Sequence, residues 1–397
     1  MISKPIPYGR QHITEEDIQA VVSTLKSDYL TQGPKIKEFE EKFAQYVGAK
    51  YAVAVNNATA GLHLSATVLG VKPGDKVIVT PLTFAASANC VRYCGGDVIF
   101  TDIDKDTYLL DVRKVEDLLK SVPKGTYKGI VPVDFAGYPV NLEAFRRLAD
   151  EYGLWILEDA CHAPGGWFTD SHGIRQRCGN GAYADLAVFS FHPVKHIATG
   201  EGGMVTTNSK ELYDALCLYR THGITKDPAK LRSHDGGWYY EMQELGYNYR
   251  LTDFQAALGI SQLERADAGL ERRHELVSRY NEAFSNVSGI KVPYNAPDVY
   301  HAYHLYVIQV EDRLGLYNYL HENKIYAQVH YVPLHLMPYY RQFGNREGDL
   351  PVMEEYYKHC LSLPMYPTLT DEEQDYVIEK VVEFTNRTGE YALKYGK

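Results

Sequence analysis

The stretch FSFHPVKHIATGEGGMVTT, residues 189–207, decides the fold of this chain. It begins in an apolar strand expected at 186–191 and ends in a second one at 203–207, with Lys195 and several glycines between them. A lysine at the exit of a buried strand can have its pKa lowered by desolvation, which leaves its amine free to form a Schiff base. Ser190 and the small residues near it can offer hydroxyl and backbone N–H donors to a phosphate. Taken alone, the stretch fits a solvated loop lysine equally well.

Composition excludes several classes of function. The 397 residues are enough for a large core and two subdomains. The formal charge of −10 and the pI near 5.8 argue against a nucleic-acid-binding surface. No apolar run approaches the ~20 residues of a membrane span, and the first residues lack a signal-peptide core. We therefore expect a cytoplasmic protein with no nucleic-acid or membrane partner.

The six cysteines are irregularly spaced. Cys90 and Cys94 could share a helix face, but no second pair completes a zinc site. We expect reduced, structural thiols and no bound metal.

Strands and helices alternate along most of the chain. Strands are expected at 51–55, 76–80, 98–103, 129–133, 154–159, 186–191 and 203–207. Helices between them, such as 142–152, make this the pattern of a mainly parallel sheet covered on both faces. Ligands collect at the carboxyl ends of the strands in such sheets.

The pattern changes after Gly289. Short strands at 303–310 and 326–330 and helices at 316–323 and 372–384 are the profile of a smaller α+β domain. A mixed-charge helix at 268–284 is expected to connect the two parts. We place the boundary in segment 286–297, so that a large domain covers residues 1–285 and a small one covers 286–397.

Candidate binding residues follow the ends of several strands. The turn at 57–59 precedes an apolar helix, where a helix N-terminus binds an anion, although an ordinary N-cap explains it as well. Phe84 can lie over a planar ligand, but core packing is the commoner role of a phenylalanine. The strand at 154–159 ends in two acids; a buried carboxylate there needs a cationic partner, unless it only caps the next helix. Asn248 and Arg250 lie in a loop, where binding residues are usually found.

Together these ordered segments resemble the sugar aminotransferases, a branch of the fold-type I pyridoxal-phosphate (PLP) enzymes, over about residues 7–384. The resemblance implies an α/β fold with a mainly parallel seven-stranded sheet between helices, plus a smaller C-terminal α+β domain. It makes PLP the cofactor, Lys195 the Schiff-base lysine and proton shuttle, and Asp159 the partner of the pyridine nitrogen. Phe84 would stack on the ring, and His162 would lie near its hydroxyl in a supporting position.

The same resemblance names the phosphate ligands and the assembly. Ala58, Thr59 and Ser190 would bind the phosphate from one chain. Asn248, in the motif Gly-Tyr-Asn-Tyr-Arg, would reach it from the neighbouring subunit, which implies a homodimer with shared active sites.

Four motifs point to a substrate: LTQG at 30–33, VDFAG at 133–137, HPVKH at 192–196 and QVHYVP at 328–333. They look most like the branch of the family that serves pseudaminic acid synthesis. That likeness implies amino transfer from L-glutamate, which leaves as 2-oxoglutarate, to C4 of UDP-2-acetamido-2,6-dideoxy-β-L-arabino-hex-4-ulose. The product would be UDP-4-amino-4,6-dideoxy-N-acetyl-β-L-altrosamine. The sugar nucleotide would lie between subunits near Thr31, Gln32, His330 and Tyr331. Arg250 would face its diphosphate or form a structural ion pair.

Several alternatives stay open. The sugar could be the D-xylo epimer or a dTDP- or GDP-linked 4-keto-6-deoxy sugar. A PLP-binding regulatory protein without turnover is a non-enzymatic alternative. A dinucleotide-binding dehydrogenase is disfavoured because the Gly-x-Gly-x-x-Gly fingerprint is missing from the first strand–helix turn. Some relatives carry histidine in place of the lysine and dehydrate their sugar, so Lys195 argues for transamination. The segment 167–181 looks longer than in the family, either as a loop near the substrate or as a surface insertion.

Overall fold

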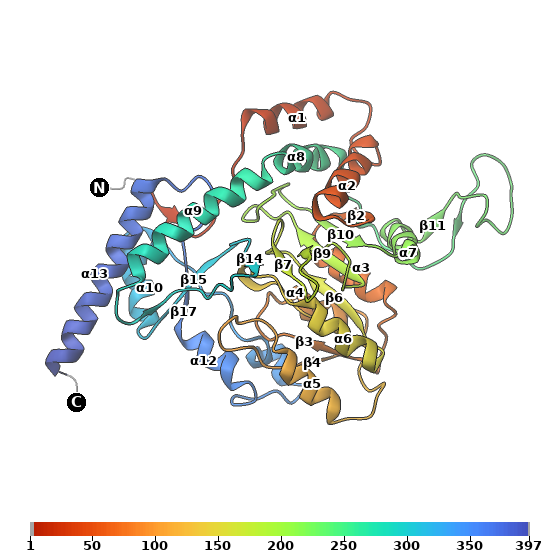
Figure 1. Cartoon of the computed structure of the whole chain (residues 1–397). Coiled ribbons are helices and arrows are strands. Elements are labelled where there is room, and N and C mark those ends of the chain that lie inside the picture. The colour runs from red at the N-terminus through yellow and green to blue at the C-terminus, as the bar shows by residue number, and fades with distance from the viewer. Residues whose placement is uncertain (1–3, 396–397) are drawn as a thin grey trace.

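A seven-stranded sheet forms the centre of the computed structural model, which describes residues 4–395 and side chains as far as Arg387. The strand order is β2-β10-β9-β6-β5-β3-β4 (Figure 1). The bounds are β2 (Tyr51–Val55), β3 (Lys76–Val79), β4 (Asp97–Phe100), β5 (Gly129–Val131), β6 (Trp155–Asp159), β9 (Leu186–Ser190) and β10 (Gly203–Thr207). β10 is antiparallel to its neighbours β2 and β9, and the other adjacent pairs are parallel. The predicted sheet is therefore confirmed.

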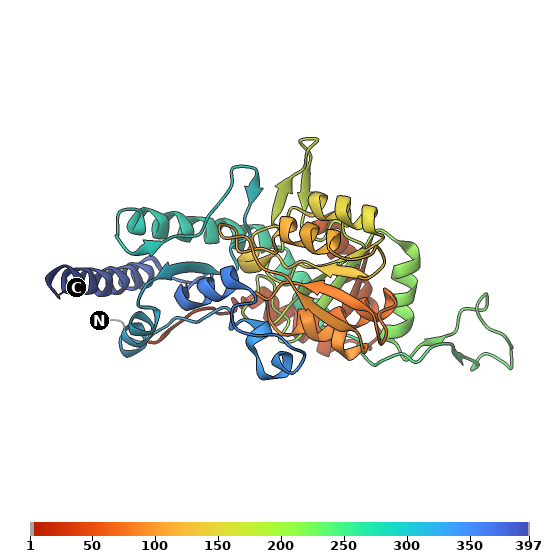
Figure 2. The ribbon, with the colours of Figure 1, turned by 90° about the horizontal axis from the view of Figure 1, so that it is seen from below.

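Helices cover both faces of this sheet (Figures 1 and 2). They are α2 (Pro34–Val47), α3 (Ala58–Val68), α4 (Ala86–Tyr93), α5 (Val112–Lys120), α6 (Leu142–Tyr152), α7 (Lys210–Arg220) and α8 (Asp253–Leu263). Successive side chains of a strand point to opposite faces. On β3, Ile78 packs in the cluster that contains α5 and α6, whereas Val77 and Val79 pack with α3 and α4. Burial on both faces explains the continuous apolar runs of the central strands.

The smaller C-terminal part contains a three-stranded sheet, β13-β15-β17. Its elements are β13 (Ile290–Lys291), β14 (Val299–Tyr300), β15 (Tyr306–Val310), α10 (Arg313–Glu322), β16 (Ile325–Tyr326), α11 (Pro338–Arg341), α12 (Pro351–His359), β17 (Cys360–Leu363) and α13 (Asp371–Tyr395). α9 (Ala266–Phe284) connects the two parts (Figure 1). The strand expected at 303–310 begins only at Tyr306, and the strand expected at 326–330 is reduced to the two residues of β16. The sequence analysis did not predict α12 or β17.

The N-terminal segment reaches this C-terminal part. β1 (Ile6–Pro7) pairs in parallel with β16, and Ile6 is buried in the same core as the second half of α9. The domain boundary at residues 286–297 stays a prediction. α1 (Glu15–Leu25) begins at a capping box, in which Thr14 N donates to Asp17 Oδ2 at 3.0 Å, and lies beside α8 in Figure 1.

Two hairpins lie outside the main sheet. β7 (Trp167–Thr169) and β8 (Arg175–Arg177) join β14 in a small sheet, so the segment 167–181 is an ordered hairpin. β11 (Ile224–Thr225) and β12 (Glu241–Met242) form an arm that projects from the body in both views (Figures 1 and 2). Within residues 4–395, none of the helices has the length and apolarity to cross a membrane.

Candidate active site

A cavity of about 610 Å³ lies where five strands of the main sheet end. Its lining includes residues at the end of β6 and β9 and residues two to four positions after β2, β3 and β5, which is where a parallel sheet presents its ligands. Nine of the predicted site residues line it: Ala58, Thr59, Phe84, Asp159, His162, Ser190, Lys195, His330 and Tyr331. The fold thus brings together most of the candidates from the strand ends.

One end of the cavity is built to bind an anion. Asn57 caps α3, its Oδ1 accepting from Ala60 N at 2.8 Å, and the helix begins at Ala58 and Thr59. N–H groups in the first turn of a helix lack intrahelical acceptors and attract negative charge. A Cβ on Gly203 would lie 2.7 Å from Ala58 N, so β10 can approach this turn only because the residue is a glycine.

The same cavity carries the carboxylate of Asp159. It is buried, and its Oδ2 accepts from Ser87 Oγ at 2.6 Å while its Oδ1 accepts from Cys161 N at 3.2 Å. Ser87 in turn contacts Thr83 Oγ1 at 2.6 Å. Ser87 was not predicted, because nothing in the sequence of α4 marks one buried serine as the anchor of a carboxylate 72 residues away.

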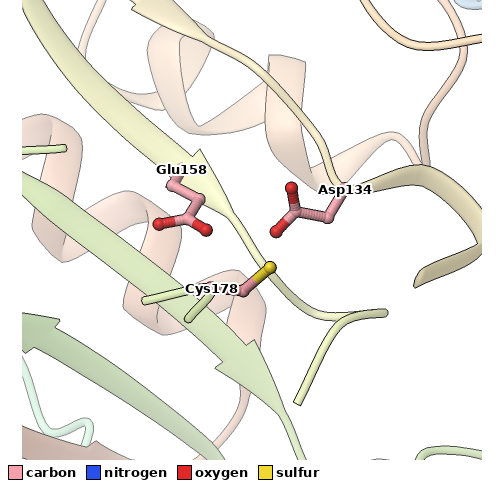
Figure 3. Close-up of side chains that lie close together, drawn as sticks. All are labelled: Asp134, Glu158 and Cys178. Carbon is pink, nitrogen blue, oxygen red and sulfur yellow. The ribbon is translucent and has the colours of Figure 1, made fainter. Parts of the chain in front are cut away.

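Glu158, the residue before Asp159, belongs to a separate buried cluster with Asp134 and Cys178, whose side chains point toward one another in Figure 3. Gly179 N donates to both Glu158 oxygens at 3.1 Å. Burial raises the pKa of Asp134 to about 7 and that of Glu158 well above its usual range. Neither carboxyl has an ion pair within residues 4–387. With these pKa values, protons neutralise the pair below about pH 7, and of these three neighbouring carboxyls Asp159 lines the cavity.

Lys195 lines the same cavity. Burial lowers the pKa of its amine to about 8; Cys161 and Asp159 oppose the shift, and Arg273 adds to it. At neutral pH roughly a tenth of such amines are unprotonated, about 300-fold more than for a solvated lysine. The amine is thus a nucleophile and a base at physiological pH. Its Nζ contacts His304 Nε2 at 3.4 Å.

His162 and Tyr331 form a second pair on the cavity wall. His162 Nδ1 accepts from Ala136 N at 3.2 Å, and its Nε2 lies 3.3 Å from Tyr331 Oη. Burial and the charge of Lys195 lower the pKa of His162 well below its usual range. A neutral ring that accepts at Nδ1 must carry its proton on Nε2, which therefore donates to Tyr331. The Tyr331 proton is then free for a ligand.

Phe84 and His330 complete the wall. The Phe84 side chain is 63 % exposed, so the core-packing alternative is wrong for it. Its ring lies 6.4 Å from that of Tyr331. His330 contacts Ser362 Oγ through Nδ1 at 2.8 Å, and burial lowers its pKa to about 3.

Four predicted residues do not reach this cavity within one chain. Gln32 and Arg250 line a different pocket, of about 300 Å³. Thr31 bridges Thr252, and Asn248 pairs with Thr221. Segment 167–181 does not line the cavity either, so the hypothesis of a substrate loop is not supported within the described chain.

The cavity also contains residues that the sequence analysis missed. Tyr8 comes from the extended N-terminal segment, Glu201 from the glycine-rich loop and His304 from the segment before β15. His304 was hidden because the pattern placed it inside a strand. The sequence did contain one signal for a site residue here, because His304 is a polar histidine at the start of an apolar run.

These features fit PLP. An anion-binding helix N-terminus would hold the phosphate, the carboxylate of Asp159 would pair with the ring nitrogen, and a low-pKa lysine lines the same cavity. The exposed ring of Phe84 at the same cavity suits a planar ligand.

A family model supplies the deciding observation: the model described as "DegT/DnrJ/EryC1/StrS aminotransferase family" matches residues 11–382. The chain belongs to this family. The predicted enzyme class, an aminotransferase, and its PLP dependence are thereby confirmed, and the dehydrogenase alternative is excluded.

Named relatives cover nearly the whole chain. The spore coat polysaccharide biosynthesis protein SpsC of Bacillus subtilis is 42% identical over 384 residues, 95% of this chain and 96% of its own. A UDP-4-amino-4,6-dideoxy-N-acetyl-beta-L-altrosamine transaminase of Campylobacter jejuni is 37% identical over 382 residues, 94% and 95% of the two chains.

Solved structures agree with the fold. Helicobacter pylori PseC, an aminotransferase involved in the biosynthesis of pseudoaminic acid, superposes with a TM-score of 0.87 at 30% identity, covering 97% of this chain and 100% of that one. The putative sugar aminotransferase Spr1654 of Streptococcus pneumoniae, in its PMP form, also gives 0.87, at 32% identity over 96% and 99% of the chains. The predicted fold-type I architecture is confirmed.

Proposed function

We propose that this aminotransferase moves the amino group of L-glutamate to C4 of UDP-2-acetamido-2,6-dideoxy-β-L-arabino-hex-4-ulose. The product is UDP-4-amino-4,6-dideoxy-N-acetyl-β-L-altrosamine. The observation that carries the chemistry is the low-pKa amine of Lys195 in the same cavity as an anion-binding helix end and Asp159. The sugar is supported by the Campylobacter transaminase and the Helicobacter PseC, which resemble this chain over almost its full length.

Each residue has a task in this proposal. PLP, when bound, supplies an electron sink that acidifies the α-hydrogen of an amino acid. Ala58, Thr59 and Ser190 bind its phosphate, and Asp159, fixed by Ser87, binds its ring nitrogen. Lys195 Nζ takes the α-proton of glutamate and, in the second half-reaction, supplies a proton to C4 of the sugar.

The part of the cavity wall formed by His162, His330 and Tyr331 is suited to a keto sugar. The neutral His162 directs the hydroxyl proton of Tyr331 into the cavity, where it can donate to a sugar oxygen. His330, also neutral, lies beside it with its ring 4.9 Å from that of Tyr331. Hydrogen bonds at such positions distinguish sugar epimers.

A second copy of the chain completes the site in this proposal. Gln32 and Arg250 line a pocket that is separate from the cavity of Lys195, and a two-fold axis can bring such a surface to the partner's cavity. Exposed apolar side chains support an interface: Ile18, Leu25, Tyr29 and Leu30 near α1, and Trp238, Met242 and Leu245 on the arm. Asn248 then contributes from the partner, as the resemblance implies.

Subunit mixing tests the shared site. We expect Lys195→Ala and Arg250→Ala homodimers to be inactive separately. Mixed dimers should recover up to about a quarter to a half of wild-type activity, because one of their two sites keeps both residues. No recovery, with mixed dimers verified by two affinity tags, would place both residues in a single chain's site.

The substrate is tested with the PLP-loaded enzyme, L-glutamate and each UDP-linked 4-keto epimer in parallel. Mass spectrometry detects the amino sugar, and NMR assigns the configuration at C4. Amination of the L-arabino substrate to the altro product supports the proposal, and amination of the D-xylo epimer alone refutes it.

The likeness to SpsC favours one alternative. That relative is a spore coat polysaccharide protein and is 42% identical. A different nucleotide-linked 4-keto-6-deoxy sugar is therefore the second candidate. It is identified by adding dTDP- and GDP-linked sugars to the same assay.

A further inference from the structure

Four consecutive residues, His301–His304, form a buried strap between β14 and β15 that contacts the loop carrying Lys195. His304 Nε2 lies 3.4 Å from Lys195 Nζ. One residue further along that loop, His196 Nε2 donates to the carbonyl oxygen of Ala302 at 2.8 Å. Two neighbouring residues of the lysine loop are thus bonded to the same strap.

Hydrogen bonds and close backbone packing hold the strap in place. Ala302 N donates to Gly137 O at 2.8 Å, and Tyr303 N donates to His301 Nδ1 at 2.9 Å. A Cβ on Gly137, whose φ is +98°, would lie 2.8 Å from Tyr303 N and 2.9 Å from His304 N. The backbone of the strap is therefore fixed beside the loop that carries Lys195.

Arg273 of α9 fixes the other side of the strap. It is fully buried, and its Nη1 donates to the carbonyl oxygens of Tyr303 at 3.0 Å, His304 at 3.3 Å and Met365 at 3.1 Å. No acidic side chain within residues 4–387 forms an ion pair with it. A buried cation without a carboxylate is costly, and its field acts on its surroundings. It lowers the pKa of both Lys195 and His304.

His304 is neutral for the same reasons. Burial is the main cause, and the positive charges of Lys195 and Arg273 add to it, so the pKa of His304 lies well below the usual range. A neutral imidazole keeps one nitrogen lone pair as an acceptor. The ring cannot serve as a counter-charge to Lys195, but it can accept a hydrogen bond from it.

We propose that His304 is the positioning residue for the free Lys195 amine, its Nε2 accepting a hydrogen bond from Nζ while that amine is not bonded to the cofactor. The proposal rests on the assignment of Lys195 as the catalytic lysine. When the α-C–H bond of glutamate breaks, the proton goes to the Nζ lone pair and the electron pair stays with the carbon. The resulting ammonium donates one N–H to His304 and keeps the others for delivery. His304 itself takes up no proton.

The contact at 3.4 Å is at the long end for a hydrogen bond and strengthens when the amine becomes cationic. Holding Nζ at one point preserves the near-attack geometry of the proton transfer. The other groups around Nζ, Asp159 and Cys161, raise its pKa and remain in place when His304 is changed.

The first test measures the Lys195 amine in the apoenzyme, without substrate. Acetic anhydride labels unprotonated amines, and mass spectrometry of the digest gives the pH midpoint for each lysine. We expect a midpoint near pH 8 for the wild type. His304→Leu removes the acceptor for the ammonium form and should move the midpoint to a lower pH, by a factor of about ten in proton concentration. His304→Gln, whose amide reaches the position of Nε2, should restore it.

Two controls separate positioning from folding. Exposed lysines in the same digest should keep their midpoints. The asparagine of His304→Asn is similar in size to the glutamine of His304→Gln, but its amide ends at the position of Nδ1. His304→Asn should therefore lower the midpoint as His304→Leu does, and it takes the place of His304→Leu if that variant does not fold. Identical midpoints in the wild type and His304→Leu, or in the Asn and Gln variants, would overturn the proposal.

A second measurement is the half-reaction of the holoenzyme with L-glutamate, which needs no sugar. The rate should fall about 10- to 100-fold in His304→Asn and remain within about threefold in His304→Gln, with little change in KM for glutamate. A change in KM alone would refute positioning. Failure of the sugar assay with an intact half-reaction would refute only the proposed substrate.

Discussion

Asp134→Asn tests the interpretation that the buried carboxyl cluster of Figure 3 is neutralised by protons. Burial raises the pKa of Asp134 from its ordinary value of 3.8 to about 7. A raised folded-state pKa means that stability is fully present below the unfolded pKa and is lost as pH rises through the folded one. The difference between the folded and unfolded pKa values corresponds to on the order of 4 kcal/mol of unfolding free energy. Asparagine fits the same space and requires no proton.

The assay is urea unfolding of the wild type and Asp134→Asn at several pH values from 4 to 8. Protein and PLP concentrations are the same for both proteins, so that association between chains and cofactor binding affect both alike. The difference in unfolding free energy, variant minus wild type, should rise with pH and level off above about pH 7. A difference that stays flat within about 0.5 kcal/mol, or one that falls, would refute the reasoning.

Asp170→Asn is the matched control. Its carboxylate accepts from Ile174 N at 2.9 Å and Gln176 Nε2 at 2.7 Å, and its pKa is lowered to about 2 although burial alone would raise it. A lowered pKa gives stability that is present above the unfolded value and lost only in acid. Its difference curve should therefore be flat between pH 5 and 8.

Three further predictions concern the cavity. Ser87→Ala removes the hydroxyl that donates to Asp159 Oδ2 at 2.6 Å and should weaken PLP binding about tenfold in an absorbance titration. Unchanged affinity would mean that Asp159 binds PLP without the hydrogen bond from Ser87. Gly203→Ala should reduce PLP affinity more than the control Gly237→Ala, because a Cβ at position 203 would lie 2.7 Å from Ala58 N, whereas a Cβ at position 237 would have nothing within 4 Å. Equal affinities of the two variants would count against a phosphate site at this helix end. Arg273→Met should move the acetylation midpoint of Lys195 upward from about pH 8, opposite to His304→Leu, because Arg273 lowers that pKa; a downward shift would contradict this account.

Local signals in the sequence determined the secondary structure of the large domain. β2 and β10 begin and end where the apolar runs predicted, since strands buried on both faces must be apolar throughout. The strand-end residues Asp159 and Lys195 were predictable because a parallel sheet gathers its strand ends at one edge. Prediction failed for β16 and for the start of β15, where burial among aromatic side chains, not alternation, decides the structure.

Only the tertiary structure decided which partners these residues have. Ser87 meets Asp159, and His304 meets Lys195 from 109 positions away. Cys178 lies close to Glu158 because it directly follows the β7–β8 hairpin, where the chain re-enters the core. Arg250 lies in a pocket that is separate from the cavity of Lys195. Periodicity in a sequence encodes which face of an element is buried, but the partner across that face depends on long-range packing. The chain alone thus determined the chemistry of its site, and the folded structure determined the groups that hold and tune it.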